Sequence, residues 1–565
     1  MTESTHTYTA VILGNPNLAL SIKGGSITLD ESSAPHVQAR LIIPIPAAAT
    51  LAALDTRLSP PPRIRLTATA VYTTTTEQRV FDLTLRDRDV DHANATVSLM
   101  LSSDEALLSD YAPLADDAGA FAAQSSLRAV VNYALGKALP GAALQAGGTD
   151  TDVTVYTDAS NLVPDPRMTD TAYYPPINCT RNYDTAIPGP LSGVAYNGIR
   201  LSAPTAQASC ISIVADTGGL RLGMQPGRTY TFSMTGEVIS TIGSPGGDAR
   251  RLVAYYRIGT GAYQSVQSPQ VPAAVGSRAR VSVTFTVPVG ATEAFIRAFH
   301  GGTSGAITWG HPRLSETDIR PGADNTEPFS GASPETAGYR YTWDNVANAS
   351  ASKRTALIDR SPEVLLWPAG RDALAFLGPI VQSFGRRLVC DEQRKWTLRD
   401  EAFTAAGSLT VRHAVNLIDA SDKVSRDDET WFDAAVVVWR WLDRDRVQRT
   451  AVDSYALPGA TRVRRFEFNR PYPGPGFAAY AVRRAQGRGR EVSATSVADW
   501  RARAEQPVQI VLNGAPIQSG KSSRVVFDLD RDEMTVLTRS VDTPANAIDL
   551  LTGTIDSLTR TIDNL

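Results

Sequence analysis

Alternation of apolar and polar residues, repeated in short runs along most of the chain, limits the possible folds more than any other feature. The runs include RIRLTATAVY at 63–72, VFDLTLR at 80–86, TYTFSMT at 229–235 and VSVTFTV at 281–287. A period of two residues is typical of strands that have one buried and one exposed face. Turn sequences such as SPGGD at 244–248 separate the runs. The sequence therefore predicts a mainly β protein with a few helices.

Helical spacing of apolar residues appears in three shorter segments. Residues 126–139 place their leucines and valines on one stripe, which predicts an amphipathic helix. Ser102 and Glu105 have the spacing of a capping box and predict the start of another helix. Residues 373–384 also have helical spacing, but Pro379 lacks the amide hydrogen that a helix needs, so we expect a kink or a split there.

Composition changes divide the chain into four segments. Residues 1–158 mix strands and helices, 159–354 are nearly all strand, and 355–541 are mixed again and include a hairpin pattern at 387–399. Many short strands with Gly and Pro turns predict a two-sheet sandwich, a jelly roll, for the second segment. Because mixed segments flank it on both sides, we expect the sandwich to be an insertion into one larger domain.

The last segment, 542–565, carries a heptad seam. Its apolar residues recur at steps of three and four: Ile548, Leu551, Ile555, Leu558, Ile562 and Leu565. Such a seam predicts self-association through a coiled coil, and the alternative is a terminal helix packed on its own domain. Isoleucine at one core position and leucine at the other favours two strands when taken alone.

Composition and motifs argue against several functional classes. The net charge of −3 over 565 residues gives no basic surface that would make nucleic acid the default partner. Neither a secretory signal nor an apolar run long enough for a membrane is present, so we expect synthesis in a cytosol without export by the general route. The sequence contains no nucleophile elbow, P-loop or dinucleotide fingerprint. We expect no enzyme activity, no catalytic residue and no cofactor.

The positions of the cysteines and histidines raise two questions, a disulfide and a metal site. Cys179 and Cys210 could form a disulfide outside a cell, although synthesis in a reducing cytosol argues against it. His300 and His311 could meet across a turn, but no metal-ligand spacing is present, so we expect no metal site.

Aromatic residues are frequent in the second segment, and three of them are our candidates for sugar contact. Exposed rings stack on the apolar faces of sugars, and Tyr255, Tyr256 and Trp309 are the residues that we select. The alternative is that these rings form the core of the sandwich. Tyr255 and Tyr256 are adjacent, so within a strand they must point to opposite faces.

Four stretches resemble tail proteins of long-tailed phages. Residues 26–46, SITLDESSAPHVQARLIIPIP, and 79–111 resemble the N-terminal part of minor tail proteins from phages of actinobacteria, in the tail-hub or baseplate-hub group. Residues 373–401, ALAFLGPIVQSFGRRLVCDEQRKWTLRDE, and 522–541 resemble the later part of the same proteins.

Two further stretches are similar to a module that such tail proteins carry as an insertion. NLVPDPRM at 161–168 and the stretch 327–354 are similar to the opening and closing stretches of carbohydrate-binding-module-like jelly rolls. An aspartate usually follows the aromatic residue in the closing stretch. Here Ser330 follows Phe329, a departure that would weaken a polar or metal contact in that turn.

The resemblance implies a structural role at the tail tip. Such hubs are homotrimers built from β-barrel domains that close the distal end of the tail tube. They contact the distal tail protein ring, the tape-measure protein and fibre or tip proteins. On this basis we expect a trimer rather than the dimer that the seam alone favours, and a virion protein assembled in the host bacterial cytoplasm.

The inserted module would then bind a glycan of the host surface. Two alternatives remain open at this stage. The chain could be a tail-associated hydrolase of cell-wall or capsule polymer, or it could be the hub of a contractile injection particle. A fold alone does not decide among these functions.

Overall fold

The computed structural model describes residues 4–72, 75–184, 197–214, 218–320, 323–424, 431–443, 445–486, 490–513 and 518–539. The heptad seam at 542–565 lies outside these residues. The chain divides into two compact units. We call Val155–Pro362 the inserted unit, and we call the described residues before and after it the discontinuous unit. The sequence analysis placed the corresponding boundaries at 159 and 354.

One thirteen-stranded sheet dominates the discontinuous unit. In pairing order its main path is β2 (Leu18–Leu20), β1 (Ser4–Ile12), β5 (Arg63–Tyr72), β6 (Thr76–Asp91), β7 (Thr96–Ser102), β4 (Val37–Pro44), β3 (Gly24–Asp30), β30 (Gln518–Asp528), β31 (Glu533–Arg539), β28 (Arg490–Val497) and β24 (Leu417–Val424). Beside this path, β29 (Pro507–Val511) pairs with β30 and with β23 (Leu409–Arg412). The mainly β class is confirmed. Within the described residues, however, the sheet has β2 and β24 at its ends and does not close into the expected barrels.

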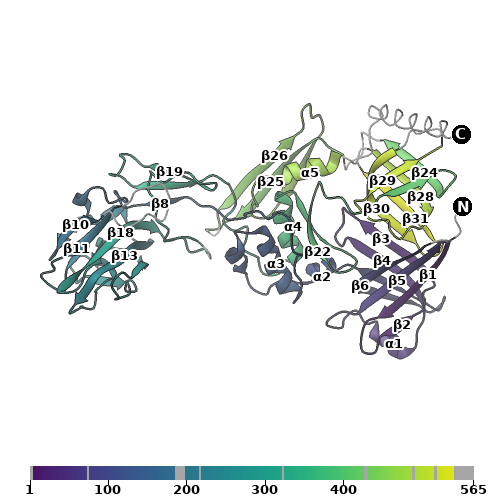
Figure 1. Ribbon diagram of the computed structural model, residues 1–565, viewed down its shortest axis with the longest axis horizontal. Coiled ribbons are helices and arrows are strands. Elements are labelled where there is room, and N and C mark those ends of the chain that lie inside the picture. Colours follow the sequence, from purple (N-terminus) through teal and green to yellow (C-terminus); the bar gives the residue numbers. More distant parts are fainter. Residues whose placement is uncertain are drawn as a thin grey trace. The chain divides into compact units, whose positions relative to one another are not determined.

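The pairing of β3 with β30 joins the two parts of the discontinuous unit. Ser26 lies opposite Asp528, and Asp30 lies opposite Arg524. Figure 1 shows the two strands side by side, β3 in purple and β30 in yellow. Residues from both ends of the chain also share one hydrophobic core, in which the Trp500 ring stacks on Phe527 at a centroid distance of 4.3 Å.

Five α-helices and five further strands complete the described part of this unit. The helices are α1 (Ala48–Ala53), α2 (Glu105–Asp110), α3 (Leu127–Ala138), α4 (Ala373–Ser383) and α5 (Phe477–Gln486), with a short 3-10 helix, η1 (Gly119–Ala123). The strands are β21 (Arg386–Cys390) and β22 (Trp396–Asp400), which form a hairpin, and the sheet β26 (Gln448–Ala456), β25 (Ala434–Leu442), β27 (Val463–Phe468). The expected helix at 126–139 and the expected hairpin are confirmed, and the Ser126 side chain caps α3.

Of the kink or split expected at Pro379, the split is wrong, because helix α4 continues through this residue. A proline at this position leaves the carbonyl group of Ala375, four residues earlier, without its helical donor. Arg470 supplies the missing donor, since its Nη1 lies 2.9 Å from the Ala375 carbonyl oxygen. A distant guanidinium therefore compensates for the proline.

The capping box expected from Ser102 and Glu105 is also wrong. Asp104 is the N-cap of α2, and no side chain caps the helix. The Glu105 carboxylate instead accepts a hydrogen bond from the Cys390 amide at 2.7 Å and another from the Ser103 hydroxyl. Burial raises the pKa of Glu105 to about 7. This carboxyl group thus links α2 to β21 across the unit and does not cap its own helix.

The inserted unit is a β-sandwich, as the sequence predicts. One sheet, which we call the β13 sheet, consists of β10 (Thr180–Asp184), β11 (Gly198–Ser202), β18 (Ser304–Glu316), β13 (Thr229–Gly243) and β16 (Arg278–Thr286). The other, the β17 sheet, consists of β15 (Gln264–Gln267), β14 (Leu252–Ile258), β17 (Ala291–Phe299), β12 (Cys210–Ser212) and β9 (Pro176–Ile177). Two 3-10 helices, η2 (Thr171–Tyr173) and η3 (Arg221–Gly223), lie in its loops.

A third, three-stranded sheet contains the two ends of the inserted unit. Its strands are β19 (Tyr339–Trp343), β20 (Ser352–Ala356) and β8 (Ala159–Asn161). Ser352 on β20 lies opposite Asn161 on β8, so the chain enters and leaves this unit at neighbouring strands. Neighbouring ends are what an insertion into a loop requires.

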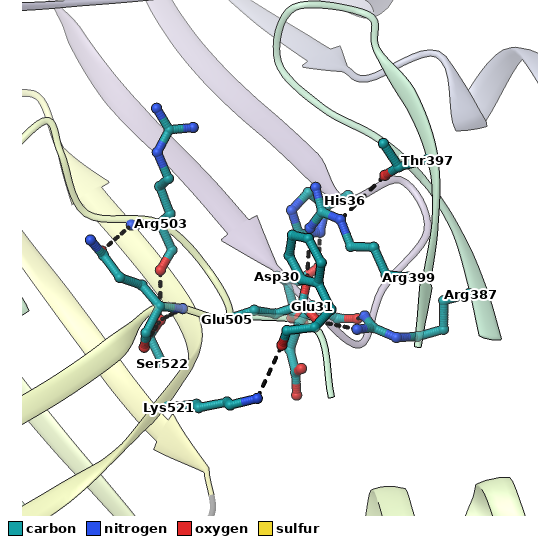
Figure 2. Close-up of polar contacts among 12 residues, drawn as sticks. Asp30, Glu31, His36, Arg387, Thr397, Arg399, Arg503, Glu505, Lys521 and Ser522 are labelled. Carbon is teal, nitrogen blue, oxygen red and sulfur yellow. Dashed lines mark hydrogen bonds and ion pairs between the residues drawn. The ribbon is translucent and has the colours of Figure 1, made fainter. Parts of the chain in front are cut away.

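A buried network of charged side chains connects several elements of the discontinuous unit, and Figure 2 shows the part of it around Glu31, Arg387, Arg399 and Glu505. Glu505 accepts hydrogen bonds from Arg387 of β21 and, at 2.7 Å, from Arg399 of β22. Glu31, which follows β3, pairs with Arg484 of α5 at 3.0 Å. The members of the network, all nearly buried, are Glu31, Arg387, Arg399, Arg484, Glu505 and Arg539. Removing one partner of such a pair leaves an uncompensated buried charge, which costs about 3–5 kcal/mol.

His36 lies next to this network, and its imidazole ring stays neutral down to a lower pH than usual. Its Nδ1 is 2.8 Å from the carbonyl oxygen of Asp30, and Figure 2 shows the ring beside Arg399. Burial, and then the positive charge of Arg399, lower the pKa of His36 to about 4. Between pH 6.5 and 4 the unfolded chain therefore binds a proton that the folded chain does not, so folding stability falls as the pH falls through this window.

We predict that His36→Asn removes this part of the pH dependence, because asparagine keeps a donor near the Nδ1 position and does not titrate. The wild-type chain should lose on the order of 3 kcal/mol more stability than the variant between pH 6.5 and 4. Urea unfolding at a series of pH values measures the difference. His413→Asn, at an exposed histidine, is the control and should follow the wild type. Parallel pH profiles for wild type and His36→Asn would contradict the prediction.

Candidate functional site

The outer face of the β17 sheet carries a cluster of aromatic and charged side chains. Side chains alternate along β14, so that Tyr255 lies on the outer face and Tyr256 packs against the core of the sandwich. The expectation that these adjacent tyrosines point to opposite faces is confirmed. Tyr255 lies directly opposite Phe295 on β17.

Three rings form a continuous ladder on this face. The ring centroids of Tyr255 and Phe295 are 5.1 Å apart with 21° between the ring planes, which is a stacked arrangement. The Tyr263 ring meets the edge of Phe295 at 5.3 Å, and it is 45% exposed. The guanidinium of Arg297 lies 5.4 Å from the Tyr255 ring centroid and 5.0 Å from that of Phe295. The stacking and the cation–π contacts hold the rings in place before any ligand arrives.

Polar groups surround the ladder. Glu293 pairs with Arg257, which lies directly opposite it, and accepts a hydrogen bond from the Tyr263 hydroxyl. The hydrogen bonds from Arg257 and then from Tyr263 hold the pKa of Glu293 below its usual range. Glu293 is therefore ionised at neutral pH, which suits an acceptor of hydroxyl hydrogen bonds and not a general acid. We call Tyr255, Arg257, Tyr263, Glu293, Phe295 and Arg297 the outer tyrosine face.

Trp309 does not belong to this face, contrary to our expectation. It is fully buried in the sandwich core, and its Nε1 donates to the Phe299 carbonyl oxygen at 3.2 Å. The reason is that its side chain faces the opposing β17 sheet and packs among the core residues of the sandwich. Strand β18 is covered on both sides, and its residues from Ala306 to Ser315 are all buried. Of the three selected aromatic residues, Tyr255 alone is placed on the outer face.

Sequence reasoning missed Tyr263, Phe295 and the charged residues beside them. Phe295 and Arg297 lie at alternate positions of one strand, and this spacing is the available signal for a shared face. Tyr263 precedes β15, and no local pattern indicates that it reaches Phe295.

The two cysteines of this unit do not form a disulfide. Both are free thiols. Cys210 belongs to the outer cluster with Val253 and Phe299, whereas Cys179 packs against the sandwich core. Their side chains therefore lie on opposite sides of the sheet, although the Cys179 thiol is 3.4 Å from the Cys210 carbonyl oxygen.

His300 and His311 are both buried. Burial, followed by the charges of Arg280 and Arg278, lowers the pKa of His311 to about 4. Across the described part of the chain, no group of three or more His, Cys, Asp or Glu residues is placed to hold a metal ion. In the same part of the chain, none of the helices has the length and apolar character needed to cross a membrane.

The closing stretch of the inserted unit forms a second polar cluster that the sequence did not indicate. Phe329 is buried, and the guanidinium groups of Arg313 and Arg354 lie 5.2 and 5.3 Å from its ring centroid. Both arginines pair with Asp324. Burial acts to raise the pKa of Asp324, but the charge of Arg313 and the hydrogen bonds that the carboxylate accepts outweigh it and lower that pKa to about 2. Ser330 makes a local turn in which its amide donates to the Ser333 hydroxyl.

Comparison with known proteins gives distant structural similarities. No protein-family model matches the sequence, and no curated protein matches it. The 43 kDa tail protein of prophage MuSo2 from Shewanella oneidensis is similar over 95% of this chain and 99% of its own, at 8% identity and a TM-score of 0.37. The tail protein from Neisseria meningitidis MC58 is similar over 94% and 96%, at 8% identity and a TM-score of 0.35.

The CBM22-1 xylan-binding domain of Paenibacillus barcinonensis Xyn10C is similar over 28% of this chain and 94% of its own, at 9% identity and a TM-score of 0.21. Scores of this size, for the tail proteins and for this domain, do not establish a shared fold.

We predict that Trp309 contributes much more to the stability of the inserted unit than Tyr263 does. Trp309→Ala should lower the free energy of unfolding of the inserted unit by about 3–5 kcal/mol, because it opens a cavity in the core. Tyr263→Ala should change it by less than about 1 kcal/mol, since the ring is at the surface. Scanning calorimetry of the full chain measures both changes. An unchanged transition for Trp309→Ala would contradict the placement of this residue in the core.

Proposed function

We propose that the chain is a structural protein of the tail tip of a long-tailed phage and that its inserted unit binds a glycan on the host cell surface. The sequence stretches at 26–46, 79–111, 373–401 and 522–541 support the first part through their resemblance to tail hubs. The discontinuous unit has the architecture that a scaffold needs. Its two halves share one sheet and one buried ion network.

The outer tyrosine face supports the second part of the proposal, which is that the inserted unit binds a glycan. Sugar rings present apolar C–H faces and hydroxyl edges, so a protein site for them combines exposed aromatic rings with fixed donors and acceptors. Tyr255 and Tyr263 supply the rings, Arg257 and Arg297 are donors, and Glu293 is an acceptor. Because Glu293 is held ionised by two donors, this face favours binding over hydrolysis.

In the proposed arrangement three chains form the hub, and the C-terminal seam gathers them. Each chain presents one outer tyrosine face. Three linked copies raise the avidity for a repeated surface polymer, so that weak binding at each face is sufficient. The distal tail protein ring, the tape-measure protein and fibre or tip proteins are the partners proposed for the discontinuous unit.

We predict that the double variant Tyr255→Ala, Tyr263→Ala binds host cells roughly five- to thirtyfold more weakly than the wild-type full chain, because it removes about 1–2 kcal/mol of ring stacking per site. Flow cytometry with a fluorescent chain on cells of the host strain, and on its purified cell-wall polysaccharide, measures the loss. Tyr183→Ala is the matched control, since Tyr183 is 46% exposed and lies in the β13 sheet. Equal binding by the double variant, with the fold intact by circular dichroism, would overturn this site.

We also predict that the full chain is a trimer, with a mass three times its 60.5 kDa, and that removing residues 542–565 reduces the trimer population at micromolar concentration. Analytical ultracentrifugation over a dilution series measures the change. Replacing Leu551 and Leu558 with asparagine is a second variant, which keeps the length of the chain. A stable dimer would contradict the trimer, and an oligomer that neither change weakens would contradict the role of the seam.

A further inference from the structure

An ion pair on the outer tyrosine face has a fixed place in the β17 sheet. Arg257 on β14 and Glu293 on β17 lie directly opposite each other, and their side chains pair. The Glu293 side chain is only 16% exposed. Both strands are internal to the sheet, because β14 lies between β15 and β17, and β17 lies between β14 and β12. The pair is therefore held by backbone pairing on both sides.

Tyr263 comes from a much less ordered setting. It lies in the connection between β14 and β15, and residues 259–263 of this connection are all exposed. A side chain on an exposed connection has several rotamers available, and ordering it when a ligand binds costs free energy. The Tyr263 ring can belong to a preformed binding face only if another part of the unit holds it.

Arg257 and Glu293 hold this ring from two directions. The guanidinium of Arg257 lies 4.7 Å from the Tyr263 ring centroid. Glu293 binds Arg257 through one carboxylate oxygen and accepts the hydrogen bond of the Tyr263 hydroxyl with the other. The edge of Phe295 meets the same ring at 5.3 Å. Together these contacts fix both the plane of the ring and the direction of its hydroxyl.

We propose that Arg257 and Glu293 are positioning residues, which hold Tyr263 in the orientation that binds the sugar, and that loss of the Glu293 charge releases the ring and weakens binding. The main contribution of the pair to binding then passes through the Tyr263 ring. This inference rests on the proposed glycan binding by the outer tyrosine face. It adds a way in which binding at that face is controlled.

The groups that face Glu293 keep it charged. Arg257 comes from β14, the Tyr263 hydroxyl from the connection before β15, and Arg221 from η3, which lies beside β17. The hydrogen bonds from Arg257 and then from Tyr263 hold the pKa of Glu293 below its ordinary value of 4.5. Protonation of Glu293 removes the ion pair and an anionic acceptor. Binding should therefore weaken as the pH falls below the ordinary range of a glutamate.

The first test replaces the carboxylate by an amide in the full chain. Glu293→Gln should bind the host cell-wall polysaccharide about three- to tenfold more weakly, because a charged hydrogen bond and an ion pair are lost. Glu237→Gln is the matched control, since Glu237 also pairs with an arginine directly opposite it, Arg278, but in the β13 sheet. Equal binding by Glu293→Gln and Glu237→Gln would overturn the proposal.

A double-mutant cycle separates positioning from direct contact with the sugar. Tyr263→Phe keeps the ring and removes the hydroxyl that Glu293 holds. If Glu293 acts through this hydroxyl, Glu293→Gln should have little further effect in the Tyr263→Phe chain. Additive losses would overturn positioning in favour of direct contact. Arg257→Lys, which keeps a cation, should bind more tightly than Arg257→Met, and equal losses would overturn the role of the charge.

The pH profile of binding provides a further readout. Wild-type binding to the polysaccharide should weaken as the pH falls below 4.5, whereas Glu293→Gln should bind weakly throughout and depend less on pH. Circular dichroism at each pH shows whether both chains stay folded. Parallel profiles of the two folded chains would overturn the dependence on the Glu293 charge.

Nitration of tyrosines by tetranitromethane, followed by peptide mass spectrometry, tests the positioning without any glycan. The reagent attacks the phenolate, and a hydroxyl that donates to a carboxylate resists ionisation. Tyr263 should therefore react several-fold faster in Glu293→Gln than in the wild type. Tyr183 is the internal standard, because it is similarly exposed and donates to the Thr169 carbonyl oxygen. An unchanged ratio of the two rates would overturn the hold of Glu293 on the ring.

The two proposals fail in different ways. If the double variant Tyr255→Ala, Tyr263→Ala loses binding but Glu293→Gln does not, the glycan face stands and the positioning role is overturned. If no variant changes binding while Glu293→Gln speeds nitration of Tyr263, the hold on the ring stands and the glycan face is overturned.

Discussion

The β3–β30 pairing is the contact that joins the N-terminal and C-terminal parts of the discontinuous unit into one sheet. The β3–β30 pairing joins Asp30 to Arg524, and beside it Glu31 and Glu505 collect arginines from β21, β22, α5 and β31. Buried charges of this kind are costly unless every partner is present. The network therefore does more than add stability. An arrangement of the two halves that separates these pairs leaves guanidinium groups buried without a carboxylate and is therefore disfavoured.

Local patterns in the sequence predict the local structure well. The alternation at 63–72 and 80–86 corresponds to β5 and β6, and the spacing at 126–139 to α3. The failures lie where a distant group decides the outcome. Pro379 does not end α4 because Arg470 replaces the missing donor. Glu105 does not cap α2 because the Cys390 amide binds it. Neither partner is visible in the sequence near the residue that it affects.

At the candidate site, too, the local pattern predicts what depends on one strand and fails where a distant segment matters. Tyr255 could be assigned to the face opposite Tyr256 from strand alternation alone, because a period of two holds for every strand. Trp309 could not, since its burial depends on which face of β18 packs against the opposing β17 sheet. The other face of the β13 sheet is covered as well, because the side chains of Ser233 and Arg280 bind the Thr326 carbonyl oxygen and hold that segment there. A single sequence carries no signal for such a cover.

The pairing of β8 with β20 has a mechanical consequence. The two backbone connections of the inserted unit leave it from adjacent strands, so a force applied to this unit acts on both of them. The two connections share the tension, whereas a module attached at a chain terminus transmits it through one. Rupture at this point then requires both connections to extend together, which suits a unit that works under force.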